Sequence, residues 1–113
     1  MGFWTLDEQN WPVYTDDVLV WGKWFEEASK TRRRVVASEN VGDVFVSTVF
    51  LGLDQNFGGG DIPILFETMV FGGPLDQEMD RYATWDEALA GHQAMVERVK
   101  SKPHEKEDTK ESE

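Results

Sequence analysis

Two stretches of the chain carry the residue types from which a binding or catalytic site could be built, and the first is residues 54–61. This segment reads Asp-Gln-Asn-Phe-Gly-Gly-Gly-Asp. Glycines expose backbone N–H groups that can hold an anion, but no Gly-Lys-Ser/Thr follows them, and the flanking carboxylates would repel phosphate. The segment is interpreted either as a flexible connection between strands or as a recognition loop. Its candidate binding residues are Asp54, Asn56, Phe57, Gly58, Gly59, Gly60 and Asp61.

The second stretch holds Glu67, the only charge in the apolar segment 64–71. A carboxylate buried without a partner is costly, so Glu67 is a candidate binding residue or a perturbed acid or base. The competing interpretation is that it faces solvent or pairs with an arginine. His92 lies on an apolar helical stripe and is interpreted as a packed, hydrogen-bonded histidine. Glu67 acting with Asp54 or His92 would be the basis of a small hydrolase, a remote alternative.

Metal and cofactor sites are not expected. The chain has no Cys and only two histidines, one of which, His104, lies in the charged C-terminal segment. Zinc sites are built from Cys and His, and the aspartates do not have the spacing of a calcium-binding loop. The sequence therefore predicts no cofactor, no metal and no catalytic residue.

The charge of the chain points to a class of partner. The formal net charge is −11; residues 101–113 hold five acids and three lysines, which leaves −9 on residues 1–100. An acidic surface repels nucleic acid and anionic lipid and suits a basic protein, although acidity also serves solubility alone. The one basic cluster, residues 32–34, is expected in a strand, where side chains alternate between faces. We expect no direct binding of nucleic acid or membrane.

Two amphipathic helices are predicted, at about 17–29 and from Trp85 to about Lys100. Asp17 and Thr84 are suited to cap them, and Thr84 with Glu87 forms a capping box. The apolar stripe of the first helix is Val18, Trp21, Trp24, Phe25 and Ala28, and that of the second is Trp85, Ala88, Leu89, His92, Met95, Val96 and Val99.

Strands are predicted between and before these helices. Segments 3–6 and 12–14 form two short strands around a turn at 7–10, and segments 32–40, 43–53, 64–71 and 78–83 are four further strands. Segment 43–53 is apolar on both faces and should be central. Short links predict antiparallel pairing. The fold class is therefore α+β: an antiparallel sheet of about four strands with two amphipathic helices packed on it, in the order short β-α-β-β-β-β-α.

One domain is predicted, residues 1–101. Pro103 should stop the second helix, and residues 104–113 hold charged and polar side chains with no apolar ones. Such a segment cannot bury apolar surface, so a disordered acidic tail, residues 102–113, is expected.

Several segments together resemble a widespread family of small uncharacterised proteins of bacteriophages and prophages. They are Val46–Asp54, Asn56–Gly60, Leu65–Gly73, Arg81-Tyr82, Thr84-Trp85, Glu87-Ala88 and Gly91-His92, with Asp16-Asp17, Trp21 and Trp24–Glu26 upstream. The family usually has His where this chain has Gln55, which argues against shared catalysis in that loop. The resemblance implies a phage origin and expression in the cytoplasm of a bacterial host.

The function expected from these observations is that of a small acidic phage accessory protein without enzymatic activity. It would bind and modulate a host or phage protein with a basic surface. The alternative is a small-molecule or nucleotide-binding protein that sequesters its ligand with loop 54–61, and a homo-oligomer could build such a pocket between subunits.

Overall fold

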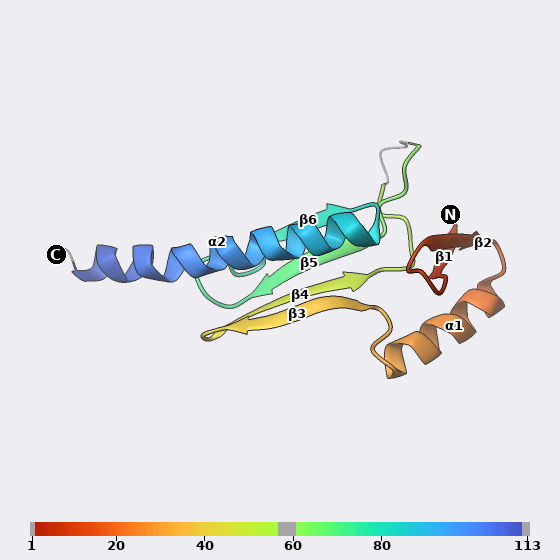
Figure 1. The fold of residues 1–113 in the computed structure, drawn as a ribbon, viewed down its shortest axis with the longest axis horizontal. Helices are drawn as coiled ribbons and strands as arrows, with labels where there is room; N and C mark the ends of the chain where they lie inside the picture. Colours follow the sequence, from red (N-terminus) through yellow and green to blue (C-terminus); the bar gives the residue numbers. More distant parts are fainter. Residues whose placement is uncertain (1, 57–60, 112–113) are drawn as a thin grey trace.

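A computed structural model describes residues 2–56 and 61–111 of the chain, with side chains through Ser101. It shows a four-stranded antiparallel sheet, a separate two-stranded hairpin and two helices (Figure 1). The elements are β1 (Phe3–Leu6), β2 (Pro12–Thr15), α1 (Val18–Lys30), β3 (Val35–Val41), β4 (Val44–Phe50), β5 (Phe66–Phe71), β6 (Met79–Tyr82) and α2 (Trp85–Glu111). The predicted α+β class is confirmed.

The four-stranded sheet has the order β3-β4-β5-β6, so the chain simply turns back at each link. As predicted, β4 is central. The side chains of Val46, Thr48 and Phe50 point to one face of β4 and are fully buried, while those of Phe45, Ser47 and Val49 point to the other. This alternation follows from the pleat of a strand. We call the buried side the inner face and the opposite side the outer face.

Helix α2 covers the inner face and contacts all four strands. Its buried side chains form two apolar clusters with the sheet. Met95, Val96 and Val99 pack on Val44, Val46 and Val70. Ala88 packs with Leu6, Phe50, Leu65 and Phe66. Leu89, which the sequence placed on the buried stripe, is 40% exposed, because it lies at the margin of the stripe.

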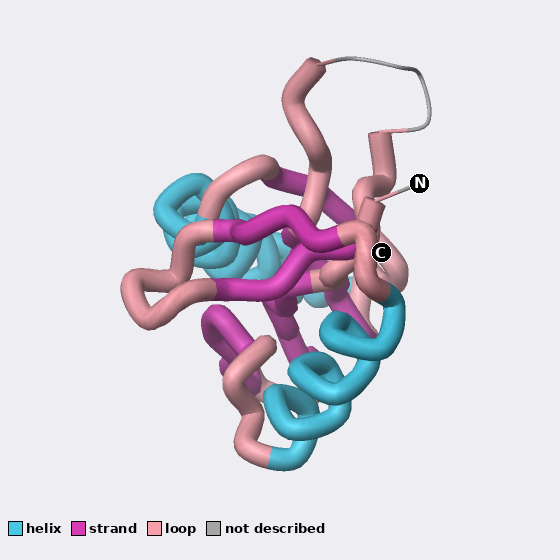
Figure 2. Tube along the Cα trace, turned by 90° about the vertical axis from the view of Figure 1, so that its right-hand side faces the viewer, coloured by secondary structure: helices cyan, strands magenta, loops and turns pink. Residues whose placement is uncertain are grey.

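Helix α1 packs on the sheet less extensively than α2. Its backbone contacts β1 and β2 and not the four-stranded sheet, and it reaches that sheet through the side chain of Trp24. Trp21 packs between Phe3 and Phe25, and Trp24 reaches Phe50 edge to face. The hairpin and α1 thus form a unit at one end of the sheet, and Figure 2 shows the two helices on different sides of the strands.

Local signals explain where the elements begin and end. Asp17 Oδ1 accepts hydrogen bonds from the backbone N–H groups of Leu19 and Val20, which starts α1. The capping box of α2 is confirmed, with Thr84 Oγ1 accepting from Glu87 N and Glu87 Oε1 accepting from Ala83 N. The backbone of α2 continues to Glu111, past the end expected near Lys100. The side chains from residue 102 on lie outside the description, and the disordered tail stays a prediction.

The arginine cluster precedes β3 and does not lie in a strand. Arg32 has a φ of 61°, and β3 begins only at Val35, so the expected alternation does not apply. Arg33 and Arg34 instead hold the α1 unit to the sheet. Arg34 Nε donates to the carbonyl of Phe50 at 3.0 Å, and its guanidinium lies 4.0 Å from the ring centre of Phe25. Burial lowers the pKa of Arg34 from its usual value.

Candidate functional site

Loop 54–61 is organised from within by its first aspartate. Asp54 Oδ1 accepts hydrogen bonds from the backbone N–H groups of Asn56, at 2.8 Å, and Ile64, at 2.9 Å. Asn56 Nδ2 donates to the carbonyl of Ile62. The polar groups of Asp54 and Asn56 therefore bind the loop itself. Asp61 is exposed, and Phe57, Gly58, Gly59 and Gly60 lie outside the described residues.

Glu67 lies on the outer face and is paired. Its Oε2 is 3.1 Å from Arg81 Nε, across the register that sets these residues opposite each other on β5 and β6. The side chain of Glu67 is 17% exposed and that of Arg81 is 39% exposed. The carboxylate thus has the arginine partner that one interpretation of the sequence expected.

His92 is packed and hydrogen-bonded under α2, as predicted. Its Nδ1 lies 2.8 Å from Thr48 Oγ1, its Nε2 lies 3.1 Å from Glu39 Oε1, and Thr48 Oγ1 lies 2.5 Å from Thr68 Oγ1. The order hydroxyl, imidazole, carboxylate matches a nucleophile with its base and orienting acid. However, Thr48 is fully buried and His92 is 1% exposed. A nucleophile in that position cannot meet a substrate without removal of α2.

The geometry separates the residues of the hydrolase hypothesis. Glu67 belongs to the outer face of the sheet and His92 to the inner side under α2, so the sheet itself lies between them. Asp54 is engaged by backbone N–H groups of its loop. These three side chains therefore cannot act on one substrate. Within the described residues, no group of three or more His, Asp or Glu side chains could hold a metal ion.

The most unusual surface lies near the N-terminus. Of the eleven large hydrophobic side chains described as exposed, six fall within residues 11–20. We call these six the N-terminal surface: Trp11, Val13, Tyr14, Val18, Leu19 and Val20. Leu19 is 81% exposed and Trp11 is 55% exposed. Contiguous exposed apolar side chains mark interaction sites, whereas single exposed hydrophobics are ordinary. Val13 and Tyr14 are successive on β2 and face opposite sides of the hairpin, so the six side chains surround this end of the molecule and do not form one flat face.

The sequence itself contains a signal for this surface. Val18, Leu19 and Val20 are three consecutive apolar residues at the start of a helix. Because successive residues on a helix point about 100° apart, three in a row cannot all belong to one buried stripe. Trp21, Trp24, Phe25 and Ala28 supply the side of α1 that packs inward, so the first turn is left outside.

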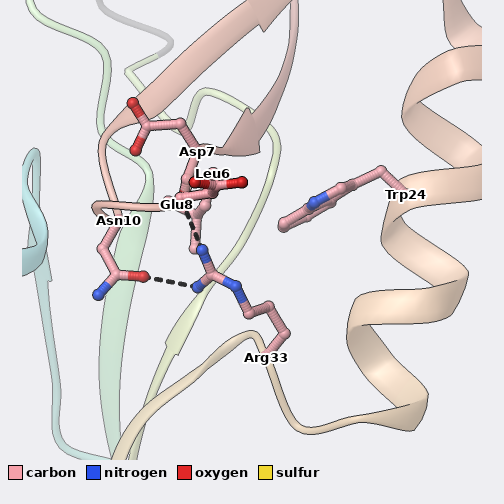
Figure 3. A pocket seen from close by; sticks show the side chains of 6 residues that line it. All are labelled: Leu6, Asp7, Glu8, Asn10, Trp24 and Arg33. Carbon is pink, nitrogen blue, oxygen red and sulfur yellow. Dashed lines mark hydrogen bonds between the residues drawn. The ribbon is translucent and has the colours of Figure 1, made fainter.

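An open hollow of about 640 Å³ lies between the β1–β2 turn, α1 and the segment that precedes β3 (Figure 3). Its lining residues are Leu6, Asp7, Glu8, Asn10, Trp24 and Arg33. Arg33 fixes its wall: one guanidinium nitrogen donates to Asn10 Oδ1 at 2.6 Å and another to the carbonyl of Asp7 at 2.5 Å. The Asp7 carboxylate accepts from the N–H groups of Gln9 and Trp11. The hollow is thus built on a rigid turn.

A smaller hollow lies between the same turn and the start of α2. It is lined by Gln9, Asn10, Trp11, Trp85 and Asp86, so the exposed indole of Trp11 forms one of its walls. Glu8, Asp16 and Asp86 are exposed carboxylates near the two hollows and the N-terminal surface, and none of the three forms an ion pair with another described residue. The apolar side chains are therefore bordered by negative charge.

Comparisons with known proteins place the chain in no family. No family model matches it, no curated protein matches it, and no solved structure matches it. In the part of the chain that the structure describes, no helix has both the length and the apolar character needed to cross a membrane.

Proposed function

We propose that this chain is a non-enzymatic interaction protein, and that the N-terminal surface is where it binds its partner. The observation that carries the proposal is the gathering of six of the eleven exposed large hydrophobic side chains within residues 11–20. Interfaces combine an apolar centre rich in aromatic residues with a polar rim. Trp11 and Tyr14 supply the aromatic side chains, and Glu8, Asp16 and Asp86 supply the rim.

The charge of the rim selects the partner. Three carboxylates without ion pairs favour a surface that presents Lys or Arg around an apolar centre, and −9 on residues 1–100 attracts such a surface at longer range. The resemblance to small phage proteins makes a host or phage protein in the bacterial cytoplasm the proposed partner. A protein whose usual ligand is nucleic acid has the required basic surface.

The test is capture of proteins from a bacterial lysate on the immobilised chain, quantified by mass spectrometry. Leu19→Ala and Trp11→Ala should each weaken the capture of the specific partner, by about 2 kcal/mol or roughly 30-fold if Trp11 is a central anchor. Phe71→Ala is the control, because Phe71 is an exposed aromatic residue at the end of β5, outside the N-terminal surface and its rim. A partner that is retained by both test variants but lost with Phe71→Ala would contradict the proposal.

The electrostatic part has a separate test. Glu8→Lys together with Asp16→Lys should reduce association and flatten its dependence on salt, because rim charges act mainly on the association rate. Glu97→Lys together with Asp43→Lys, at exposed positions on α2 and between β3 and β4, changes the net charge by the same amount away from the surface and should have a smaller effect. Equal effects of the rim and control substitutions would show that only the total charge matters.

A further inference from the structure

In the described part of the chain, no helix covers the outer face of the four-stranded sheet. Helix α2 covers the inner face, and α1 has no backbone contact with β3, β4, β5 or β6; its Trp24 reaches Phe50, which belongs to the buried inner face. Figure 1 shows α1 beyond the β3 side of the sheet, away from β5 and β6. The outer face along β4, β5 and β6 presents Phe45, Ser47, Val49, Glu67, Met69, Phe71, Met79 and Arg81.

One end of this face is apolar. Phe45 and Phe71 lie opposite each other with ring centres 6.1 Å apart, and Met69 lies opposite Met79. Phe71 is 48% exposed, Met79 is 40% exposed and Phe45 is 38% exposed. An antiparallel sheet with one face in solvent normally has apolar side chains on its inner face and polar ones on its outer face. The aromatic and thioether side chains on the outer face of this sheet therefore indicate that another surface covers it.

The charge of this face is balanced, in contrast to the rest of the chain. Glu67 and Arg81 are its only charged side chains on β4, β5 and β6, and they pair with each other. The chain as a whole carries −11. A second copy would be repelled by most other surfaces of the molecule, whereas this face can approach its own copy without net repulsion.

We infer that the outer face binds a second copy of this chain, sheet to sheet. The register supplies charge complementarity for such a dimer. Consider a two-fold axis that runs parallel to the strands and above the gap between β5 and β6. Rotation about this axis places β5 of one copy over β6 of the other copy. Each residue of β5 then faces, in the second copy, the same residue that is its cross-strand partner within its own chain. Glu67 then lies over Arg81 of the second copy, and Met69 lies over Met79 of the second copy. Face-to-face sheets align within about 30°, so residues near the axis keep this match.

This arrangement is what symmetric assembly requires. A two-fold dimer uses the same patch on both subunits, so the patch must complement itself. Two carboxylate–guanidinium pairs would form across the interface, flanked by methionines, which adapt to irregular packing. A basic partner protein, by contrast, gains nothing from a face without net charge, so this surface is distinct from the N-terminal surface.

The first measurement is the mass of the chain in solution by light scattering or sedimentation, over a series of concentrations. The wild type should reach twice its 12.9 kDa monomer mass. Met79→Lys should shift the equilibrium to the monomer, although it lowers the net negative charge. Leu19→Lys makes the same chemical change on the N-terminal surface and should remain dimeric. A wild type that stays monomeric throughout, or a dimer lost with Leu19→Lys but kept with Met79→Lys, overturns the inference.

A mixing experiment tests the charge pairs directly. In Glu67→Arg, positions 67 and 81 are both cations, and in Arg81→Glu they are both anions. Each variant should therefore repel its own copy and stay monomeric. When the variants are mixed in equal amounts, both cations of one chain lie over the anions of the other, and native mass spectrometry should show a heterodimer. Circular dichroism of each variant shows whether it is folded. Mixing restores opposite charges between the two chains but not within either chain. Folded variants that remain monomeric when mixed would therefore overturn the proposed pairing between copies.

Discussion

The hydroxyl of Thr48 is the centre of a hydrogen-bonded chain that crosses the interface between α2 and the sheet. A neutral imidazole with its proton on Nε2 satisfies every member: Thr68 donates to Thr48, Thr48 donates to His92 Nδ1, and Nε2 donates to Glu39. Buried polar groups are tolerated only when they are paired in this way.

Removal of the Thr48 hydroxyl should therefore be costly. Thr48→Val preserves volume but leaves His92 Nδ1 and the Thr68 hydroxyl without this partner, and we expect a loss of about 1–3 kcal/mol in the free energy of unfolding. Urea denaturation followed by Trp fluorescence measures it. Thr68→Val is the comparison, and the double variant should cost less than the sum of the two single ones. Full additivity would show that the hydroxyls are not coupled.

In contrast to Thr48, the buried hydroxyl oxygen of Tyr82 has no hydrogen-bond partner among the described residues. Burial raises the pKa of Tyr82 above its usual value of 10.0, with a smaller opposing effect of the nearby Thr68 hydroxyl and a small further rise from Asp80. The hydroxyl groups of Tyr82 and Thr68 are not placed to form a hydrogen bond with each other, so we assign Tyr82 mainly a packing role. Its ring lies so close to Gly91 that a methyl group there would overlap it.

The raised pKa makes a prediction for alkaline pH. Since the unfolded chain loses the Tyr82 proton at a lower pH than the folded chain, stability is intact below about pH 10 and falls as pH rises towards the folded-state pKa. Tyr82→Phe should remove this part of the fall and leave neutral-pH stability nearly unchanged. Tyr14→Phe, at an exposed tyrosine, is the control. Identical alkaline unfolding curves for wild type and Tyr82→Phe would contradict the assignment.

At the scale of elements, the hairpin β1–β2 and α1 form a unit attached to the sheet by few directional contacts. Arg33 bonds the turn through Asn10 and the Asp7 carbonyl, and Trp4 N donates to the carbonyl of Gly52 at 2.9 Å. Apart from Leu6, the strands of the hairpin are half-buried or exposed, and such segments open locally before the whole fold does.

Loss of Arg33 should loosen this unit selectively. We expect Arg33→Ala to accelerate hydrogen exchange at backbone amides of β1, β2 and their turn, while amides of β4 and β5 keep their protection. Exchange read by NMR or mass spectrometry resolves the two groups. Arg32→Ala is the matched control, since Arg32 is exposed and forms no side-chain bond with described residues. Uniform acceleration across the sheet would show that the unit and the sheet unfold together.

The sequence predicted these elements better than their arrangement. The caps at Asp17 and Thr84 and the alternation in β4 and β5 depend on neighbouring residues, so the helix starts and the central strand could be predicted. The stripe on α1 showed that one side is buried but not against what. In the same way, a carboxylate in an apolar strand such as Glu67 has an obvious need for a partner, but only the register shows that Arg81 is opposite. The sequence placed Val18 on the buried stripe of α1, whereas it is 51% exposed, because exposure of the run Val18–Val20 depends on which side of α1 packs.

At the scale of the molecule, repulsion among acidic groups opposes the compact state. Residues 1–100 carry −9, and the described ion pairs are mostly exposed, such as Lys30–Glu26 and Lys100–Glu97. Exposed pairs contribute little.

Salt should therefore stabilise the fold. Raising sodium chloride from low ionic strength to about 0.15 M shortens the screening length to roughly 8 Å and weakens the long-range repulsion. The thermal midpoint should rise, and it should rise less in a variant with Glu97→Lys and Glu27→Lys. Differential scanning calorimetry at one protein concentration measures this. A midpoint that falls with salt would mean that the ion pairs outweigh the repulsion.

The hydrogen-bonded chain under α2 also determines the position of this helix along the sheet. Contacts of Met95, Val96 and Val99 with the valines of β4 and β5 are non-directional, so a helix displaced by one turn would still bury apolar surface. It would, however, bring Ala88 or Val96 to the place of His92 and leave the buried hydroxyl of Thr48 without its acceptor. The hydrogen bond between His92 and Thr48 thus selects one position of α2 along the sheet. The same hydrogen bond thereby sets the distance between the start of α2 and the β1–β2 hairpin.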